Sequence, residues 1–535
     1  MNADCIRFDQ VPHSSKLFLD FLAHSPAQAP FYAAHTISAV AEYARSLGFD
    51  AQRRRAVADV LERQNREWEG SQATLASIER FRAGAVAVVS GQQVGLFGGP
   101  FYSILKAASA LQLAAELSAR GIDAVPVFWL ATEDHDLAEV NQVALPGDDG
   151  RFEVATLPMS AIARGAANSP VGQVRFGAEI GPLVEKMSQL LGGELSAMLR
   201  SSYRAGETFG SAFGRLFSKL FAGTGLILMQ PLEREVHALA APVLLQAAEA
   251  AQELNQELLR RGQQLRNAGY HEQVKVTASS TLLFVFQDGE RTVMHTAGDD
   301  FLVGAQRLSR EEVLRRLREH PEQFSPNVLL RPVVQDYLLP TAAYFGGPAE
   351  IAYFAQAAMV YGRLLGRVTP VLPRLSATMV NTRMQRLLDR YGLQLPDLFD
   401  GEEKLRERIA RRVLPAALQE QLEKARQAVE REVNGLTEQL KVLDATLAPA
   451  AEKAGRKMQY QLQRLAGKAS RAELRKHEQL ARHAAELMNG LFPGGHLQER
   501  TAPGILVLGE HGLDLLPKLV DLASAHCPGH YVFRV

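Results

Sequence analysis

Two apolar runs, each followed at once by polar residues, constrain the fold of this chain more than any other feature. They occupy Ala85–Ser90 and Val125–Ala131, and each has the length and the β-branched or aromatic content of a strand covered on both faces. The segment between them, Phe101–Arg120, has the periodicity of an amphipathic helix. This order predicts a βαβ unit of a parallel sheet, in which ligands bind beyond the carboxyl ends of the strands.

Other strand-like segments extend this unit into a larger fold. Further apolar runs that we expect in the same sheet are Gly225–Gln230, Thr341–Phe345 and Arg367–Leu372. The stretch Gln273–His295 differs, because its side chains alternate around a Gln-Asp-Gly-Glu turn as in a β-hairpin. We therefore predict an α/β protein with a Rossmann-like parallel-sheet core, into which further domains are inserted near residues 151–200 and 261–330.

The sequence pattern divides the chain into four regions. Residues 1–80 are amphipathic and charge-rich, and they predict an N-terminal helical region with no buried strand before Ala85. We expect the core to span residues 81–385 and a helical coiled-coil domain to span residues 386–495. Residues 496–535 predict a strand, a helix and a strand that return to the core.

The third region carries a heptad-like pattern, in which apolar residues recur every three or four positions. The members of this seam are Leu418, Leu422, Ala425, Val429, Val433, Leu436, Leu440, Leu443 and Leu447, then, after the break at Ala448-Pro449, Met458, Leu462, Leu465, Ala469 and Ala472. We predict two antiparallel helices that form a coiled-coil arm. Leu480, Leu487 and Met488 flank the seam and are candidates for a surface that binds a second copy of the chain.

Composition excludes several classes of protein. The chain has 59 basic and 59 acidic residues, so its overall charge favours neither nucleic acid nor an anionic membrane as a partner. No apolar run reaches the roughly 18 residues of a membrane-spanning helix, and the first residues lack the pattern of a signal peptide. Cys5 and Cys527 lie at opposite ends of the sequence and indicate neither a disulfide framework nor a zinc site. We expect a cytoplasmic protein with small-molecule partners.

The residues after the first strand predict a ligand site. This stretch contains neither standard phosphate-binding motif. Gly98 and Gly99 nevertheless allow close approach to the backbone, and Pro100 suits the start of a helix whose free N–H groups favour an anion. Similar glycines also occur in tight turns that bind nothing. The candidate binding residues here are Ser90, Gln92, Gln93, Gly98, Gly99, Tyr102 and Ser103.

The second strand runs into an acidic cluster that extends from Glu133 to Asp136. Clustered carboxylates raise one another's pKa values, and an adjacent imidazole can carry a proton, so Glu133, Asp134 and His135 are candidate catalytic residues. Asp136 has a second interpretation, because Asp136 and Glu139 have the spacing of a helix capping box. One histidine among these acids matches no standard metal motif, and we predict no metal.

Two further groups of residues supply charged candidates for binding. The candidates are Arg331, Asp336 and Glu350 in the stretch Ser325–Gln356, and Arg374 and Ser376 after the strand Arg367–Leu372. Glu350 falls in the first turn of a predicted helix, where a carboxylate also interacts favourably with the helix dipole. Arg374 can pair bidentately with a phosphate or carboxylate, or it can cap a surface loop.

Five stretches together resemble one known family. They are SGQQVGLFGGPFYSILKA, PVFWLATEDHDLAEVN, SPNVLLRPVVQDYLLP with the later GGPAEIAYFAQ, PRLSAT and FPGGHLQER. In this order they are similar to the bacillithiol biosynthesis cysteine-adding enzymes, the BshC family of cysteine ligases, over essentially the whole chain. The resemblance implies a Rossmann-like core with connecting-peptide insertions and a coiled-coil domain associated with homodimers. It also implies the addition of L-cysteine to glucosaminyl-malate as an amide, the last step of bacillithiol biosynthesis.

The core of this family is itself similar to class I aminoacyl-tRNA synthetases and to the mycothiol cysteine ligase, which activate an acyl group with ATP. By position, Gly98–Ser103 corresponds to their HIGH motif and Pro373–Thr378 to their KMSKS motif. Neither motif is present as written, so the histidines and lysines that hold the triphosphate in those enzymes are missing. ATP or ADP is the cofactor that the resemblance implies.

The residues are compatible with ligation and leave two other classes of function open. Amide formation needs an activated carboxyl group, a deprotonated amine and a stabilised oxyanion. Asp134 or His135 can take the amine proton, and Arg331 or Arg374 can bind the malate carboxylates or a phosphate. A nucleotide-binding regulatory or scaffolding protein would have no use for the acidic cluster. A metal-dependent hydrolase would use Asp134, His135 and Asp136 as ligands.

Overall fold

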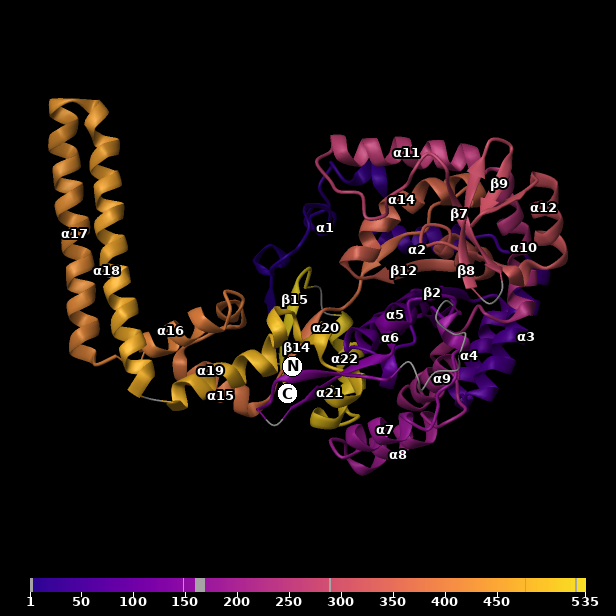
Figure 1. Cartoon of the computed structure of the whole chain (residues 1–535), viewed down its shortest axis with the longest axis horizontal. Helices are drawn as coiled ribbons and strands as arrows, with labels where there is room; N and C mark the ends of the chain where they lie inside the picture. Colours follow the sequence, from indigo (N-terminus) through magenta and orange to yellow (C-terminus); the bar gives the residue numbers. More distant parts are fainter. Residues whose placement is uncertain are drawn as a thin grey trace.

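The computed structural model describes residues 3–147, 149–158, 169–287, 290–412, 414–476, 478–524 and 527–535. A body that contains all the β-sheets carries a long helical arm, and the two ends of the chain lie next to each other near the base of this arm (Figure 1). The predicted α/β class and the predicted coiled-coil arm are both confirmed.

The centre of the body is the predicted parallel sheet, with strand order β13–β12–β2–β3–β6. Its strands are β2 (Val86–Gln92), β3 (Ala124–Leu130), β6 (Ile227–Met229), β12 (Thr341–Gly346) and β13 (Val371–Pro373). β3 and β12 are buried along their whole length, as their uninterrupted apolar sequences predict. The chain runs from β2 through β3 to β6 on one side of β2, and β12 and β13 lie on the other side. The topological switch point is therefore between β2 and β12.

Helices cover both faces of this sheet. One face packs against α3 (Ala51–Glu67), α4 (Gln72–Ala83) and α10 (Arg234–Glu249). The other packs against α2 (Ile37–Ser46), α5 (Tyr102–Ala119) and α9 (Phe209–Leu220). Successive side chains of β3 point to opposite faces, so Phe128 joins the α5 and α9 side and Trp129 joins the α3 and α10 side.

A second five-stranded sheet follows α11 (Ala251–Asn267) and is antiparallel, with strand order β10–β9–β8–β7–β11. Its strands are β7 (Ser280–Gln287), β8 (Glu290–Ala297), β9 (Asp300–Val303), β10 (Gln306–Leu308) and β11 (Phe324–Pro326). β7 and β8 form the predicted hairpin, and residues 288 and 289 of its turn lie outside the described residues. A smaller hairpin joins β4 (Gln142–Pro146) and β5 (Phe152–Thr156).

A third sheet unites the two ends of the chain. β1 (Ala3–Ile6) pairs antiparallel with β15 (His530–Arg534), and β15 pairs parallel with β14 (Ala377–Val380). β1 lies before Ala85, but only Ile6 in it is buried, so it is not a buried strand of the kind that the sequence excluded there. Cys5 and Cys527 form a disulfide with their Cα atoms 6.1 Å apart, a pairing that their positions at opposite ends of the sequence did not indicate. Pairing of β1 with β15 brings the two cysteines together, although 522 positions separate them in sequence.

The chain leaves the body through α15 (Thr382–Tyr391) and α16 (Glu402–Arg412), and returns through α19 (Glu478–Leu491). The arm is an antiparallel pair, α17 (Ala416–Leu443) and α18 (Ala448–Lys476). The predicted seam is confirmed in part: Val433 approaches Gly455 so closely that a Cβ atom there would lie 2.7 Å from its Cγ1, and Leu422, Ala425, Val429 and Leu440 are half-buried. Leu418, Leu436, Leu443, Met458 and Leu465 are exposed instead.

Two other expectations near the arm were also wrong. Leu480, Leu487 and Met488 are buried in the body and offer no surface to a partner. The predicted strand near residue 505 is a helix, α21 (Gly504–His511), which is followed by α22 (Leu515–Ser524) and then β15. α22 packs on α5, so this segment lies against the core.

The remaining helices connect these layers. They are α1 (Lys16–Leu22), α6 (Leu137–Val140), α7 (Ile180–Ser188), α8 (Gly193–Ser202), α12 (Arg310–Glu319), α13 (Arg331–Leu338), α14 (Pro348–Leu365) and α20 (Gln498–Thr501). None of the helices in the described ranges is long and apolar enough to span a lipid bilayer.

Candidate active site

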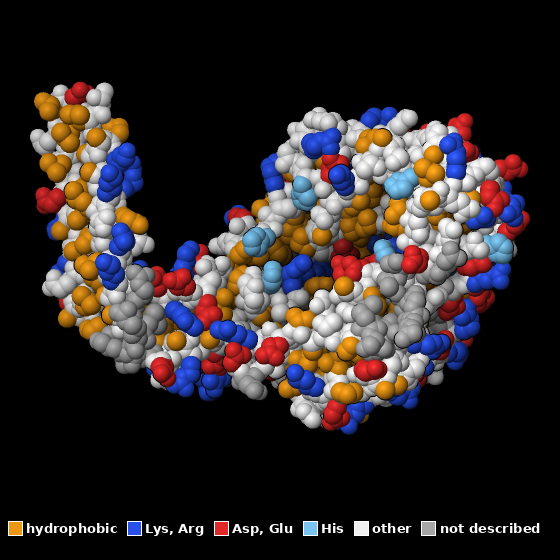
Figure 2. Space-filling view, viewed as in Figure 1, with side chains coloured by type: hydrophobic (Ala, Val, Ile, Leu, Met, Phe, Trp, Pro, Cys, Tyr) orange, Lys and Arg blue, Asp and Glu red, His pale blue; other side chains and the backbone are white. Residues whose placement is uncertain are grey.

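A cavity of about 550 Å³ opens at the carboxyl ends of the parallel strands, at the switch point between β2 and β12. Residues at the ends of β2, β3, β12 and β13 line it, and the antiparallel sheet contributes Phe284 and Arg291 as the opposite wall. Figure 2 shows this side of the body hollowed between its two halves, with hydrophobic side chains and charges of both signs in the hollow. The cavity therefore lies between the Rossmann-like core and the inserted sheet.

The acidic cluster after β3 does not act as one group, because its members face different directions. Glu133 and Asp134 line the cavity, and Asp134 accepts a hydrogen bond from Gln93 (Nε2 to Oδ2, 2.7 Å). His135 does not line it. Its Nδ1 faces a guanidinium nitrogen of Arg291 at 3.1 Å. Asp136 accepts a hydrogen bond from the Glu139 N–H and caps α6, as the capping-box spacing predicts.

Glu133 is the most deeply buried carboxyl of this cluster, with 7% of its surface exposed. Burial raises the pKa of its side chain, while the nearby charges of His237, Arg291 and Arg331 oppose this rise. Its Oε1 lies 3.4 Å from Nε2 of His237, a buried histidine in the first turn of α10. A carboxylate with a raised pKa at a cavity wall is suited to accept a proton near neutral pH.

A buried ion pair occupies the opposite side of the strand ends. Lys106, on α5, donates to the Gly91 carbonyl at 2.7 Å and to Gln92 Oε1 at 2.9 Å, and lies 2.6 Å from Glu350 Oε2. Burial alone would raise the pKa of Glu350, but Lys106, the Gly347 N–H and the Tyr344 hydroxyl together hold it below its usual value. Glu350 is thus an ionised acceptor that fixes Lys106 and the start of α14.

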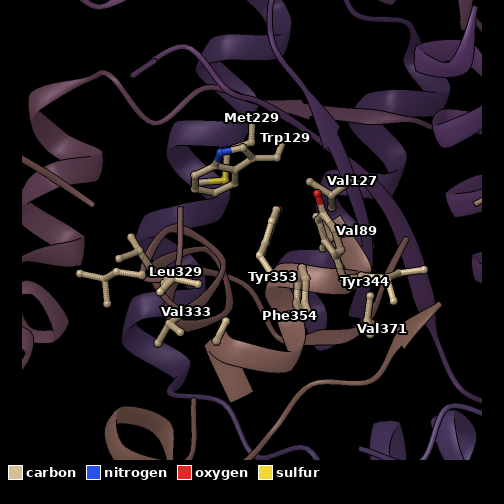
Figure 3. Close-up of a cluster of buried hydrophobic side chains, with 14 of the residues drawn as sticks. Val89, Val127, Trp129, Met229, Leu329, Val333, Tyr344, Tyr353, Phe354 and Val371 are labelled. Atoms are coloured by element: carbon tan, nitrogen blue, oxygen red, sulfur yellow. The ribbon is translucent and has the colours of Figure 1, made fainter. Parts of the chain in front are cut away.

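Aromatic rings form the floor of the cavity. Trp129, Tyr344 and Tyr353 line it and also belong to the buried hydrophobic cluster beneath it, in which Tyr353 lies between Trp129 and Tyr344 (Figure 3). Arg331 rises from α13 beside these rings and donates to Tyr353 Oη at 3.1 Å and to Gln335 Oε1 at 3.2 Å. Within the described ranges Arg331 has no carboxylate partner, so its charge is available to an anionic ligand.

A second cavity of about 420 Å³ adjoins the first, and the two share the wall formed by Gly347, Pro348, Ala349, Arg374 and Arg500. Arg374 is not free to bind a ligand as an unpaired cation. Its guanidinium donates to Glu499 Oε1 at 2.7 Å, and both side chains are almost completely buried.

The same carboxylate organises a buried chain of hydrogen bonds in this wall. Glu499 also accepts from Ser376 Oγ at 3.0 Å and from the Ala377 N–H at 2.8 Å. His530 lies between Ser376 and Thr378, 2.8 Å from each hydroxyl. Burial lowers the pKa of His530 to about 4, so this imidazole is neutral near pH 7.

The other predicted binding residues lie away from both cavities. Ser90 is fully buried and donates to the Phe345 carbonyl, and Ser103 is also fully buried. Gly98 and Gly99 form the tight turn at positive φ values of 87° and 73°. The predicted anion site at this helix start is not formed, because the Gly98 N–H donates to Tyr203 Oη and the Phe101 N–H to the Ala502 carbonyl.

Asp336 also has an internal role. It accepts hydrogen bonds from Tyr361 Oη at 2.6 Å and Gln335 Nε2 at 2.9 Å, and burial raises its pKa. The structure therefore brings together Gln92, Gln93, Tyr102, Glu133, Asp134, Arg331, Glu350 and Arg374 at the first cavity, and Arg374 and Ser376 at the second.

Sequence reasoning missed several residues of these walls. Lys106 had a readable signal, because it is a lysine on the apolar side of an amphipathic helix. Glu499 lies in the stretch FPGGHLQER, which carries the family resemblance but no local sign of a site. Arg291 and His237 had no signal, since each meets the site only through pairing of segments distant in sequence. Among the described residues, no three His, Cys, Asp or Glu side chains gather as ligands for a metal ion.

The chain was compared with known protein families and curated proteins. Residues 1–375 match the N-terminal Rossmann-like domain of the bacillithiol biosynthesis protein BshC, and residues 377–535 match its C-terminal coiled-coil domain. A relative from Koribacter versatilis is 48% identical over the full length of both chains, and one from Solibacter usitatus is 38% identical, also over the full length of both. A third, from Salinibacter ruber, is 33% identical over 97% of this chain and 96% of its own. All three carry the name "Putative cysteine ligase BshC". The chain therefore belongs to the BshC family of bacillithiol biosynthesis, a family of ligases.

Proposed function

We propose that this ligase joins the carboxyl group of L-cysteine to the amino group of glucosaminyl-malate, as the last step of bacillithiol biosynthesis. The observation that carries the proposal is the polarity of the first cavity: a buried proton acceptor, Glu133, lies on one wall, and Arg331, which forms no ion pair with a carboxylate among the described residues, lies on another. The amine of an amino sugar must lose a proton to become nucleophilic, and malate brings two carboxylates that need cationic partners. Such substrates are small metabolites of the cytoplasm, where we place the reaction.

Each wall has a distinct part in this reaction. Glu133, assisted by Asp134, accepts the proton of the attacking ammonium group. Arg331 and the exposed Arg500, which lines both cavities, bind the malate carboxylates. The aromatic floor of Trp129 and Tyr353 provides an apolar surface for a sugar ring. Lys106 and Glu350 fix the ends of β2 and β12 against each other, which keeps the opposite walls at a constant separation.

The carboxyl group is activated on the substrate in this proposal. No serine, threonine, cysteine or histidine side chain lines the first cavity, so its described residues offer none of these nucleophiles for an acyl-enzyme. We propose ATP as the activating co-substrate, because a free carboxylate does not form an amide spontaneously in water. The residues that the family resemblance assigns to a nucleotide are only partly at the cavities. Tyr102 and Arg374 line the first cavity, but Gly98, Gly99 and Ser103 line neither, and Arg374 is paired with Glu499. We therefore derive no step through ATP.

We also propose that two copies of the chain associate through the arm. The argument is the exposed apolar surface on α17 and α18, where Leu436, Leu443, Met458 and Leu465 are between 50% and 78% exposed. Figure 2 shows hydrophobic side chains along the face of the arm in view. Isolated apolar residues on a surface need no explanation, but a stripe along two helices is typical of a surface that binds another helix pair.

One experiment tests the proposed reaction. The purified protein is incubated with L-cysteine and glucosaminyl-malate, with and without ATP, and the products are identified by mass spectrometry. Formation of the cysteinyl amide only when ATP is present supports both the reaction and its energy source. An amide formed without ATP removes ATP from the proposal, and absence of the amide under all conditions refutes the proposed function.

A further inference from the structure

Glu133 is in contact with a second buried residue, His237, to which the proposed reaction assigns no role. His237 lies in the first turn of α10, on the sheet face opposite α5, and 4% of its surface is exposed. Its Nε2 is 3.4 Å from Glu133 Oε1. Glu133 follows β3 and lines the cavity, whereas His237 is not among the lining residues. The imidazole therefore approaches the carboxyl group from behind, as seen from the cavity.

The charged groups around Glu133 show why His237 is the one that acts on its carboxyl group. The titratable and charged groups that face Glu133 are His237 from α10, Arg291 from β8 and Arg331 from α13. The two arginines have other hydrogen-bond partners: Arg291 donates to Ser325 Oγ and to the Pro326 carbonyl, both at 2.8 Å, and Arg331 donates to Tyr353 and Gln335. Of these three groups, His237 is the one with a ring nitrogen recorded in close contact with the carboxylate itself, at 3.4 Å.

We propose that His237 is a positioning residue, whose imidazole keeps the Glu133 carboxylate ionised and oriented to take the proton of the attacking amine. The inference rests on the proposed function and adds a residue to it. In the step itself, one N–H bond of the substrate ammonium breaks and an O–H bond of Glu133 forms. The freed nitrogen lone pair then makes the C–N bond to the activated cysteine carboxyl carbon, and the activating group leaves with its bonding electrons while the nitrogen releases its second proton to solvent water.

Electrostatics gives the direction in which replacement of His237 shifts the pKa of Glu133. A buried carboxylate without a hydrogen-bond donor is less stable in its charged form, so its pKa rises further. Since the base must be ionised to act, the acidic limb of the kcat/KM profile then moves to higher pH. A variant that merely disturbs packing lowers kcat/KM at every pH by the same factor and leaves the limb in place.

The test compares His237→Leu, which removes the donor, with His237→Gln, which keeps a side-chain N–H in the same region. We expect the acidic limb of His237→Leu to move up by about one pH unit or more, with kcat/KM at pH 9 within about threefold of wild type. His237→Gln should restore the limb to within a few tenths of a unit, about the wild-type position. Equal losses at all pH values in both variants would overturn the inference.

A second measurement separates this inference from the proposed reaction. The carboxyl carbons of glutamate are labelled with ¹³C, the Glu133 signal is assigned by its loss in Glu133→Gln, and the signal is titrated in wild type and in both His237 variants. This titration needs no turnover, so it remains decisive if the wild-type protein forms no amide. A higher Glu133 pKa in His237→Leu than in His237→Gln supports the inference, and identical values refute it. Thermal unfolding and circular dichroism establish that each variant is folded. If His237→Leu does not fold, His237→Phe takes its place in both measurements.

Discussion

The walls of the cavity and the helices of the arm contain the same types of charged residue in opposite settings. In the body, Lys106 with Glu350 and Arg374 with Glu499 are buried pairs that join segments far apart in sequence. On the arm, Arg426 pairs with Glu423 and Lys441 with Glu438, each pair exposed and one helical turn apart. A buried charge without its partner is costly, whereas an exposed one is solvated by water. The stability of the body therefore depends on individual charged pairs, and the stability of the arm does not.

The apolar residues of the body and of the arm also differ in how far they are buried. In the body they are buried, down to the aromatic cluster beneath the cavity (Figure 3). On the arm, the small residue Gly455 lies at the contact between α17 and α18, against Val433, and several large apolar residues remain on the outside. The body is thus complete by itself, and the arm presents unused apolar surface. Each prediction below tests one side of this contrast.

The largest expected effect concerns the acidic wall. Glu133→Gln should lower kcat for amide formation by about 100-fold or more, the usual scale of general base catalysis, and Asp134→Asn should have a smaller effect of the same sign. His135→Ala is the matched control, because His135 lies outside the cavity lining and should retain most of the activity. Loss of activity in His135→Ala equal to that in Glu133→Gln would show that the cluster acts as a unit. Because burial raises the Glu133 pKa, wild-type activity should fall with decreasing pH above the usual range for a glutamate.

The buried pair in the shared wall should dominate stability. Glu499→Gln leaves Arg374 without its carboxylate, and we expect the free energy of unfolding to fall by about 3–5 kcal/mol. Arg374→Met should cost about as much, and the double variant should cost less than the sum, as expected for two residues in contact. The exposed arm pair supplies the control, since Glu423→Gln should leave the denaturation midpoint unchanged. Additive single effects at Arg374 and Glu499 would contradict the coupling.

A smaller effect depends on pH. The His530 pKa is about 4 in the folded protein, and the ordinary value of 6.5 applies once the chain unfolds. As pH falls, the unfolded chain binds the proton first, so this contribution to stability is complete above pH 6.5 and is lost between pH 6.5 and about 4. The loss amounts to roughly 3 kcal/mol at most. Urea unfolding at pH 7 and pH 4.5 checks it, and His530→Asn should show a weaker pH dependence than wild type.

The arm should respond differently to substitution. Leu436→Glu combined with Leu465→Glu places charges on its exposed apolar surface, and should convert a dimer into a monomer without lowering the unfolding temperature. Sedimentation equilibrium measures the mass, and Val433→Glu at the internal contact is the matched variant that should destabilise the arm. A wild-type protein that is monomeric at micromolar concentration would refute the dimer.

The smallest expected change is at the cap of α6. Asp136→Asn keeps a side chain that can cap a helix, so the free energy of unfolding should change by less than about 1 kcal/mol and kcat should stay near wild type. A large loss of activity would return Asp136 to the catalytic cluster.

Local patterns in the sequence predicted the elements that local forces determine. β2 and β3 were readable because burial on both faces requires an apolar run, whereas β13 is shorter than the predicted segment Arg367–Leu372. The cap at Asp136 was readable because capping depends on spacing alone. The position of Glu133 and Asp134 at a strand end also followed from the βαβ pattern.

Long-range partners could not be predicted in this way. Nothing near Glu499 or His530 indicates that β14 and β15 lie side by side, and nothing near Cys5 indicates β15 as its neighbour. Part of the seam of the arm was placed wrongly for a different reason, since Val433 lies at the contact but Leu436 and Leu465 are exposed. Heptad spacing identifies large apolar residues, but close approach of two helices is allowed by small ones such as Gly455.

The third sheet also fixes the place where the chain leaves the body for the arm and returns from it. Met379, at the end of β14, exchanges two backbone hydrogen bonds with the side chain of Gln498, at 2.9 and 3.1 Å. The polypeptide thus leaves β14 and returns to it at a single point, and the 118 residues between these two positions include the arm together with α15 and α19, whose apolar residues pack in the body. A short linker that joins the bases of α17 and α18 should therefore preserve both this packing and the β14–β15 pairing. The arm could then be shortened, exchanged or tagged at its tip. Activity at the cavity would report whether the body has been disturbed.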